Sequence, residues 1–393
     1  MDMTKYPLVD EHTLCVTGLE VLGKLPDPFL FEDGRRVTTR TEWELRRREL
    51  YKTAIELQYG TMPPQPEVFR VEAVYVGRPR TYRITAGTRE RQVSFRMQLW
   101  LPAEPTKTPP PVIVDGDQCF GYPADREWLG AALDEGIGWA LFDRTELAHD
   151  IQGEGRRQGA LYEVYPAYSF GALGAWAWGY SRVVDALEQI GLTDMDCIAF
   201  TGHSRGGKTA ALAGALDERA AIVNPNETCA GACGCYRVHM TGHGDGIPEF
   251  RSERLADLWQ NFGYWMGEGM EKYAQDEASL PFDCHELKAM IAPRTLFISE
   301  AAGDLWANPV GSYLTTQAAQ EVYRFLGAED ELFWYFRPGT HYHRVEDVCM
   351  LVSLVKRRRD GGEGFDPSRF FRLPFPEPRP IFDWSAPTPT DDA

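Results

Sequence analysis

Short apolar runs alternate with longer amphipathic stretches from about residue 111 to residue 358. The runs that are candidate strands lie at 112–115, 139–142, 198–201, 221–223, 295–298 and 332–336. The stretches between them predict helices at about 171–191, 206–217, 312–326 and 345–358. Apolar strands that alternate with helices are typical of a parallel sheet covered on both faces. The chemistry of such a sheet lies at the carboxyl ends of its strands.

The residues before this region follow a different pattern. Thr41 and Glu44 match a capping box and predict a charged amphipathic helix that ends near residue 59. Partly alternating β-branched and aromatic residues predict antiparallel edge strands at 68–76, 81–84 and 93–101. We therefore expect an N-terminal extension that packs on the core, a catalytic domain and a Pro-rich tail, at 1–66, 67–360 and 361–393 respectively.

The composition narrows the range of ligands. Acidic residues outnumber basic ones by 58 to 41 in 393 residues, so the formal net charge is −17. Such a charge argues against DNA or RNA as a partner, and an anionic substrate would need a local cluster of positive charge. Hydrophobic residues make up 43% of the chain, which is enough for a full core.

Membrane and export signals are not apparent in the sequence. No run of eighteen apolar residues occurs, and the first residues lack the apolar core and cleavage site of a secretory signal. We therefore expect no membrane association and a cytoplasmic location, or a secreted or periplasmic one if an export signal has been removed.

The eight cysteines are spread along the chain, which fits free thiols in a reducing compartment. Cys229, Cys233 and Cys235 form a tight group, but their spacing lacks a second C-x2-C half. We expect no metal site there.

Residues 198–208 combine a buried strand, the motif Gly202-His203-Ser204-Arg205-Gly206 and the start of an Ala-rich helix. This G-x-S-x-G context is typical of a nucleophile elbow, in which glycines let strand and helix pass closely and the turn lifts the serine hydroxyl above the sheet. The N–H of the residue after the serine favours a developing oxyanion. Ser204 is therefore the candidate nucleophile.

A serine nucleophile needs a base, and the base needs an acid that orients it. With a nucleophile elbow the histidine follows the last strand, and here that loop holds His341 and His343. Two positions compete for the acid. Asp304, with Glu300 nearby, follows the strand at 295–298, whereas Glu227 follows the strand at 221–223. The general pattern of a triad does not choose between them.

The stretch from Gly202 to Lys208 resembles the elbow of the glucuronoyl esterases of carbohydrate esterase family 15, which reads G-C-S-R-x-G-K. The arginine after the serine and the lysine four residues beyond it are more specific than G-x-S-x-G alone. Further similarity lies in L-P-D-P-F at 25–29, F-G-Y-W at 262–265, L-P-F-D-C-H-E-L at 280–287 and I-A-P-R at 291–294. The resemblance implies an α/β-hydrolase fold with a mostly parallel central sheet, helices on both faces in a three-layer sandwich, and an N-terminal extension.

Roles for individual residues follow from the same resemblance. It implies Ser204 as the nucleophile, Glu227 as the acid and Arg205 as a support of the oxyanion hole. Lys208 would bind hydroxyls of the sugar ring, and Trp306 would contact the sugar, with a plain core aromatic as the alternative for Trp306.

One departure from the family bears on the base. Fungal members pair a cysteine just before the nucleophile with a cysteine just after the catalytic histidine. Here those places hold His203 and, if His343 is the base, Arg344. This alignment favours His343, with His341 as the alternative base and Asp304 as the alternative acid.

Together these observations predict a serine carboxylic-ester hydrolase without a cofactor. Its substrate would be a small or glucuronoxylan-derived ester of glucuronic or 4-O-methylglucuronic acid, such as a lignin–carbohydrate ester, and the chain would be a monomer or weak oligomer. One alternative is a sugar acetyl esterase or other small-ester carboxylesterase on the same fold, against which Lys208 and Trp306 argue. The other is a catalytically silent, carbohydrate-binding α/β-hydrolase fold, against which a complete serine, histidine and acid set argues.

Overall fold

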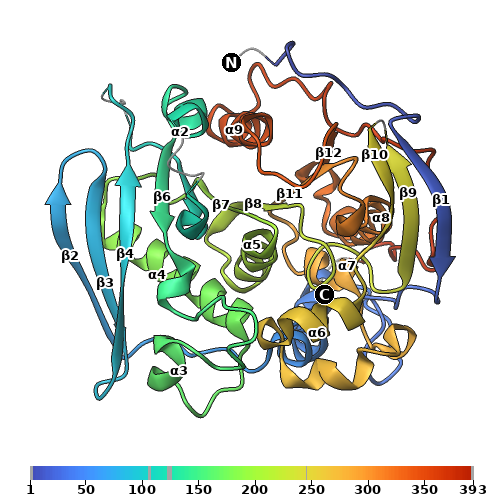
Figure 1. The fold of residues 1–393 in the computed structure, drawn as a ribbon, viewed down its shortest axis with the longest axis horizontal. Coiled ribbons are helices and arrows are strands. Elements are labelled where there is room, and N and C mark those ends of the chain that lie inside the picture. The colour runs from blue at the N-terminus through green and yellow to red at the C-terminus, as the bar shows by residue number, and fades with distance from the viewer. Residues whose placement is uncertain (1–2, 105–107, 122–125, 245, 391–393) are drawn as a thin grey trace. The chain divides into compact units, whose positions relative to one another are not determined.

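A computed structural model describes residues 3–104, 108–121, 126–244 and 246–390. Contacts between Cα atoms divide the chain into two compact units, and Figure 1 shows the path of the chain. Unit 1 comprises Met1–Tyr6, Thr61–Asn226 and Tyr342–Pro367, and unit 2 comprises Pro7–Gly60, Glu227–His341 and Ser368–Ala393. The domain boundaries expected from the sequence stay a prediction.

Unit 1 is built on a sheet with the strand order β8-β7-β5-β6-β4-β3-β2. Its strands are β2 (Val68–Val76), β3 (Arg80–Gly87), β4 (Gln92–Trp100), β5 (Val112–Asp115), β6 (Gly138–Phe142), β7 (Ile198–His203) and β8 (Ala220–Asn226). The strands from β8 to β6 pair in parallel, whereas β4, β3 and β2 continue the sheet in antiparallel pairing. Every residue of β5, β6, β7 and β8 is buried, as expected for strands covered on both faces.

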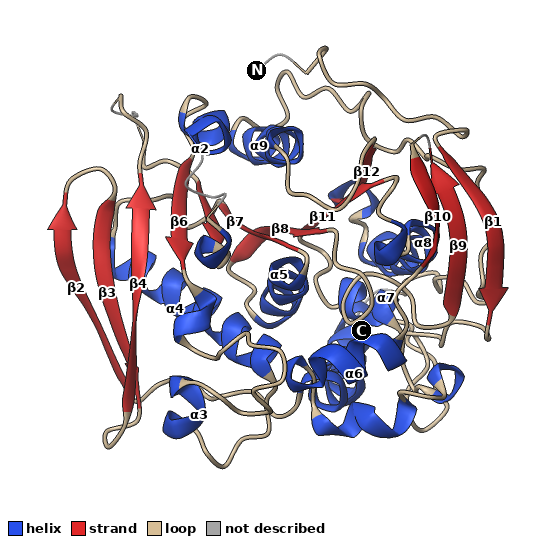
Figure 2. Cartoon of the chain, in the orientation of Figure 1, coloured by secondary structure: helices blue, strands red, loops and turns tan. Residues whose placement is uncertain are grey.

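Helices cover both faces of the parallel part of this sheet. They are α2 (Arg126–Leu133), α4 (Ala172–Ile190), α5 (Arg205–Leu216) and α9 (Val345–Arg359), whereas the short helix α3 (Ala160–Val164) contacts β4. Figure 2 shows α4 and α5 on one side of β7 and β8, and α2 and α9 on the other. Within the described part of the chain, none of the helices combines the length and apolar character that a membrane crossing requires.

Unit 2 contains a parallel pair and a separate antiparallel sheet. The pair is β11 (Thr295–Ala301) with β12 (Leu332–Arg337), and the sheet has the order β1-β9-β10 (Leu14–Val21, Val238–Gly244 and Ile247–Arg251). Its helices are α1 (Arg40–Leu50), the π-helix η1 (Tyr51–Leu57), α6 (Leu255–Phe262), α7 (Cys284–Ala289) and α8 (Pro309–Leu326). Apolar side chains of β1, β9, α8 and β12 share one hydrophobic cluster.

The described part of the Pro-rich tail from Ser368 onward is bound to unit 2 by backbone hydrogen bonds. The N–H groups of Leu14 and Leu25 donate to the carbonyls of Pro374 (2.7 Å) and Ile381 (3.0 Å), and the N–H of Thr390 donates to Thr38 (2.9 Å). Residues 391–393 of the expected tail lie outside the described residues.

The expected strands and helices all occur, with ends that shift by a few residues. The capping box placed at Thr41 was wrong by two positions. Thr39 is the N-cap of α1 and accepts a hydrogen bond from the N–H of Glu42 (3.1 Å), while the Glu42 carboxylate accepts from the N–H of Thr38 (2.8 Å). The sheet of β1, β9 and β10 was not predicted, because its exposed positions and glycines leave no continuous apolar run.

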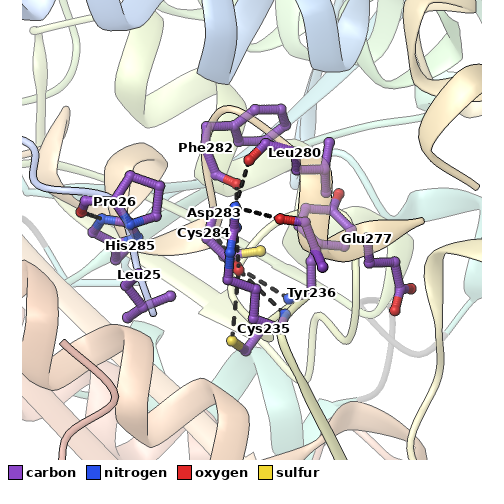
Figure 3. Close-up of polar contacts among 12 residues, drawn as sticks. Leu25, Pro26, Cys235, Tyr236, Glu277, Leu280, Phe282, Asp283, Cys284 and His285 are labelled. Carbon is purple, nitrogen blue, oxygen red and sulfur yellow. Dashed lines mark hydrogen bonds and ion pairs between the residues drawn. The ribbon is translucent and has the colours of Figure 1, made fainter. Parts of the chain in front are cut away.

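A fully buried carboxylate, that of Asp283, joins distant segments of unit 2 (Figure 3). It accepts hydrogen bonds from the N–H groups of Tyr236 (3.0 Å), Arg237 (3.2 Å) and Cys284 (2.7 Å), and it pairs with the Arg237 guanidinium (3.1 Å). Beside it, a ring nitrogen of His285 lies 2.9 Å from the carbonyl oxygen of Pro26. Two of the stretches that resemble the esterase family, 25–29 and 280–287, are therefore in direct contact.

We predict that Asp283→Ala lowers the free energy of unfolding by about 3–5 kcal/mol, because it leaves the buried Arg237 without its counter-ion and removes the N-cap of α7. Urea or guanidinium unfolding would measure the change. The matched control is Asp276→Ala, which removes an exposed carboxylate of the same unit and should change stability by less than about 0.5 kcal/mol. An equal effect of the two substitutions would contradict the role given to Asp283.

Candidate active site

Ser204 lies on the turn between β7 and α5, in a backbone conformation that few residues other than glycine adopt. Its φ is 58° and its ψ is −119°. Its N–H donates to the carbonyl of Asn226 at the end of β8 (2.9 Å), and its carbonyl accepts from the N–H of Lys208 (2.9 Å). Ser204 itself is only half-buried, so the turn presents a reachable hydroxyl above buried strands, as the elbow motif predicts.

Two glycines make this turn possible. A Cβ atom on Gly202 would lie 2.5 Å from the backbone of Gly206, so strand and helix pass too closely for a side chain. A Cβ atom on Gly206 would lie 2.0 Å from a carboxylate oxygen of Asp117. That buried carboxylate accepts a hydrogen bond from the N–H of His203 (2.7 Å). The glycines therefore let Asp117 hold the residue before the nucleophile.

A chain of alternating charges runs from Asp117 to Arg205. Arg144, which is fully buried, pairs with Asp117 and lies 3.6 Å from the carboxylate of Asp150. Asp150 in turn accepts from the guanidinium of Arg205 (3.2 and 3.3 Å). Burial lowers the pKa of Arg144, against the opposing charge of Asp150. Since each cation has an anion beside it, Arg205 is held next to the nucleophile.

Lys208 lies on the first turn of α5 and is 3% exposed. A lysine this buried is uncommon. Lys208 and Arg205 are two basic residues within the first turn of the helix that follows Ser204, in a chain whose net charge is −17.

His341 lies between two carboxylates in unit 2. Its Nδ1 is 2.5 Å from an oxygen of Asp304 and 3.2 Å from an oxygen of Glu227. Burial alone would lower the pKa of His341, but the hydrogen bonds and charges of Asp304 and Glu227 outweigh it and raise the pKa to about 10. Both acids that the sequence left open thus meet at the same imidazole nitrogen.

Arg337, the last residue of β12, contacts both Glu227 and the loop before His341. It forms a fully buried ion pair with Glu227. The same guanidinium donates to the carbonyls of Pro338 (3.2 Å) and Thr340 (3.3 Å), in the loop that leads to His341. Glu300 lies elsewhere: it accepts from the hydroxyl of Ser312 (2.6 Å), and burial raises its pKa to about 8.

His343 has different surroundings, in unit 1. Its ring stacks on that of His203, with centroids 5.8 Å apart, and meets the edge of Trp128 at 5.3 Å. These surroundings differ from those of His341, which contacts the carboxylates of Asp304 and Glu227.

Trp306 is half-buried on the short 3-10 helix η8 (Leu305–Ala307). Its ring contacts that of Phe250 (centroids 5.8 Å apart), and the Arg251 guanidinium lies 5.4 Å from its centroid. The role of Trp306 in sugar binding stays a prediction.

Roles for Asp117, Arg144, Asp150 and Arg337 were not predicted from the sequence. These residues lie at the carboxyl ends of β5, β6 and β12 or, for Asp150, further along the loop that follows β6. A search of every such loop for charged residues would have selected them, but it would not have shown which charges pair.

The chain is similar to known proteins in sequence and in fold. The family model described as "Glucuronyl esterase, fungi" matches residues 84–327. A 4-O-methyl-glucuronoyl methylesterase of Podospora anserina is 33% identical over 360 residues, which cover 88% of this chain and 70% of that protein.

Solved structures show the same similarity. A carbohydrate esterase family 15 glucuronoyl esterase from Caldicellulosiruptor kristjansonii has a TM-score of 0.79 and 30% identity, over 92% of this chain and 97% of that one. A mutant glucuronoyl esterase from Sporotrichum thermophile, in complex with methyl 4-O-methyl-β-D-glucopyranuronate, has a TM-score of 0.71 and 25% identity, over 92% of each chain.

The fold and the site define a class of protein: a carboxylic ester hydrolase with the α/β-hydrolase fold, in which helices surround a mostly parallel central sheet. The strand–turn–helix at Ser204 has the geometry of a nucleophile elbow in that fold. The chain belongs to the glucuronoyl esterase family, carbohydrate esterase family 15. The resemblance seen in the sequence is confirmed.

We predict that Gly206→Ala lowers kcat/KM for ester hydrolysis by about 100-fold or more, because the added Cβ displaces the Asp117 carboxylate and with it the turn at Ser204. Steady-state kinetics together with the melting temperature would measure the effect. Gly130→Ala in α2 is the control, since its Cβ would find its nearest neighbour at 3.7 Å and alanine favours a helix by about 1 kcal/mol. Full activity in Gly206→Ala would contradict this account of the turn.

Proposed function

We propose that this chain hydrolyses esters of glucuronic or 4-O-methylglucuronic acid, with Ser204 as nucleophile and His341 as base. The observation that carries the choice of substrate is the pair of cations at the nucleophile turn, Arg205 and Lys208, in a strongly acidic chain. The acyl half of a uronate ester leaves as a carboxylate, and these cations give that anion a place to bind. A glucuronoxylan-derived ester is the natural substrate that fits this chemistry.

The first half-reaction forms an acyl-enzyme. His341 takes the proton of the Ser204 hydroxyl, and the oxygen attacks the ester carbonyl at C6 of the uronate. The backbone N–H and the guanidinium of Arg205 bind the oxyanion, and each such donor contributes about 3–4 kcal/mol in comparable sites. The imidazolium then gives its proton to the departing alcohol.

The second half-reaction releases the uronate. Water gives a proton to His341 and attacks the acyl-enzyme, and the imidazolium returns a proton to Ser204 as the ester bond breaks. Lys208 binds hydroxyls of the sugar ring, and Trp306 packs against the sugar. Both roles come from the family resemblance.

The contacts of the two histidines support His341 over His343 as the base. An imidazole that carries a proton on Nδ1 toward a carboxylate exposes its Nε2 as the proton acceptor. His341 has this arrangement with Asp304 and Glu227, whereas the ring of His343 stacks on that of His203 and contacts that of Trp128. Glu227 and Asp304 act together as the acid: Asp304 is nearer to the ring, and Arg337 shares the charge of Glu227.

The substrate assignment predicts a clear preference among model esters. The chain should hydrolyse benzyl glucuronate with a kcat/KM at least about 100-fold above that for p-nitrophenyl acetate, because an acetyl group cannot use the contacts of Lys208 and Trp306. Initial rates with the two esters would measure it. Ser204→Ala, as the control, should remove both activities.

Two other outcomes would each favour one of the alternative functions. Activity on the acetate alone would favour a sugar acetyl esterase and contradict the uronate assignment. No activity on either ester, in a folded chain, would favour a silent carbohydrate-binding fold.

The two histidines give a second prediction. His341→Ala should lower kcat by about 10,000-fold or more, since the base and its link to both carboxylates are lost together. His343→Ala should retain most of kcat and lower stability by about 1–3 kcal/mol, because it removes the ring contacts with His203 and Trp128. Measurements of kcat and of unfolding by denaturant for both variants would test this prediction. Loss of turnover in His343→Ala alone would return the base to His343.

A further inference from the structure

Three side chains of unit 2, one of them His341, have the donor atoms and the spacing of metal ligands. The proposed ester hydrolysis does not involve a metal. The thiol of Cys229, a carboxylate oxygen of Asp304 and a ring nitrogen of His341 all lie within 4.8 Å of one another. Cys229 and Asp304 are each 4% exposed, and His341 is half-buried. All three belong to unit 2.

The backbone holds two of these ligands in place. Cys229 has a left-handed φ of 58°, and its Sγ lies 3.8 Å from the carbonyl oxygen of Glu227. Asp304 is the N-cap of η8 and accepts from the N–H of Ala307 (3.3 Å). Small changes of side-chain torsion would bring the three donors to the roughly 2.0–2.3 Å that zinc needs.

The three donors are a sulfur, a nitrogen and an oxygen. Such a mixed set suits a thiophilic cation, whereas Mg²⁺ and Ca²⁺ prefer oxygen ligands alone. Three protein ligands around an open fourth position is also a common zinc arrangement. We infer that Cys229, Asp304 and His341 bind Zn²⁺ or Cd²⁺ with a water as the fourth ligand. The thiol of Cys229 releases its proton to solvent as the sulfur–metal bond forms.

The spacing of the cysteines predicted no metal site in the group at 229–235, and the site inferred here uses only part of that group. The group of Cys229, Cys233 and Cys235 contributes only its first member. Cys235 points to Asp283 at 3.7 Å, and the N–H of Cys233 donates to the hydroxyl of Thr228. The other two ligands come from loops that are distant in the sequence.

The effect that we expect of a bound metal ion on catalysis rests on the proposed function, in which His341 is the base. A cation bound here occupies the imidazole and the nearer of its two carboxylates, so His341 cannot accept the proton of Ser204. Zinc should therefore inhibit ester hydrolysis reversibly, and a chelator should restore the rate.

The test measures binding and inhibition separately on the full chain. Zn²⁺ binding is followed by calorimetry, and Cd²⁺ binding by the ultraviolet absorption of the cadmium–thiolate bond. The variants are Cys229→Ser, which keeps the size of the side chain, and Cys15→Ser, which removes an exposed thiol of the same unit as a control. The inhibition of each variant is normalised to its own rate without metal.

We expect one equivalent of metal to bind the unaltered chain and Cys15→Ser, and affinity to fall by about 10-fold or more in Cys229→Ser. The concentration of zinc that halves the rate should rise by the same factor. Equal binding by Cys229→Ser and the unaltered chain would overturn the site, even if ester hydrolysis is as proposed. Metal binding that depends on Cys229 in a chain without esterase activity would keep the site and refute the proposed function instead. If Cys229→Ser does not fold, the ultraviolet absorption of the cadmium–thiolate bond is measured on Cys15→Ser instead. Absence of this absorption band would overturn the proposal.

Discussion

The buried ion pair of Arg337 and Glu227 is the interaction on which the site depends. Glu227 is fully buried and has a left-handed φ of 46°, and an ionised carboxylate in such a place is costly without a cation beside it. Arg337 supplies that cation from the end of β12, and it also binds two carbonyls of the loop that carries His341. One guanidinium therefore pairs with the proposed acid and also binds the loop that carries the proposed base.

The nucleophile turn is maintained by the same physical means. A buried carboxylate, Asp117, binds the backbone next to Ser204, and Arg144 and Asp150 relay alternating charge from it to Arg205. An unpaired charge is costly in a protein interior, so removing any one of these side chains would destabilise its former partners. In a protein with a net charge of −17, these pairs keep the guanidinium of Arg205 beside the proposed nucleophile.

Much of this could be predicted from the sequence, because local patterns carry it. The buried strands and the elbow at Ser204 follow from apolar runs and glycine spacing, and Arg205 and Lys208 are adjacent to the motif. Glu227 and Asp304 were each predicted as a candidate acid, but that both carboxylates meet at His341, with Arg337 beside Glu227, could not be predicted, because these residues converge only through the pairing and packing of distant strands. The antiparallel sheet of β1, β9 and β10 escaped for a related reason: its stability comes from partners far along the chain, and its own residues are half-exposed.

The central claim is that His341 is the catalytic base and that Asp304 binds its imidazole. The most direct test is the pH dependence of kcat/KM in Asp304→Asn. Only the neutral imidazole can act as base, so the rate rises with pH through the pKa of the histidine. The charge of Asp304 helps to raise that pKa to about 10, so removing it should move the rising limb to a pH lower by about one or more. Glu249→Gln, which removes an exposed carboxylate on β10, should leave the limb in place. An unchanged limb in Asp304→Asn would show that the catalytic base is not His341.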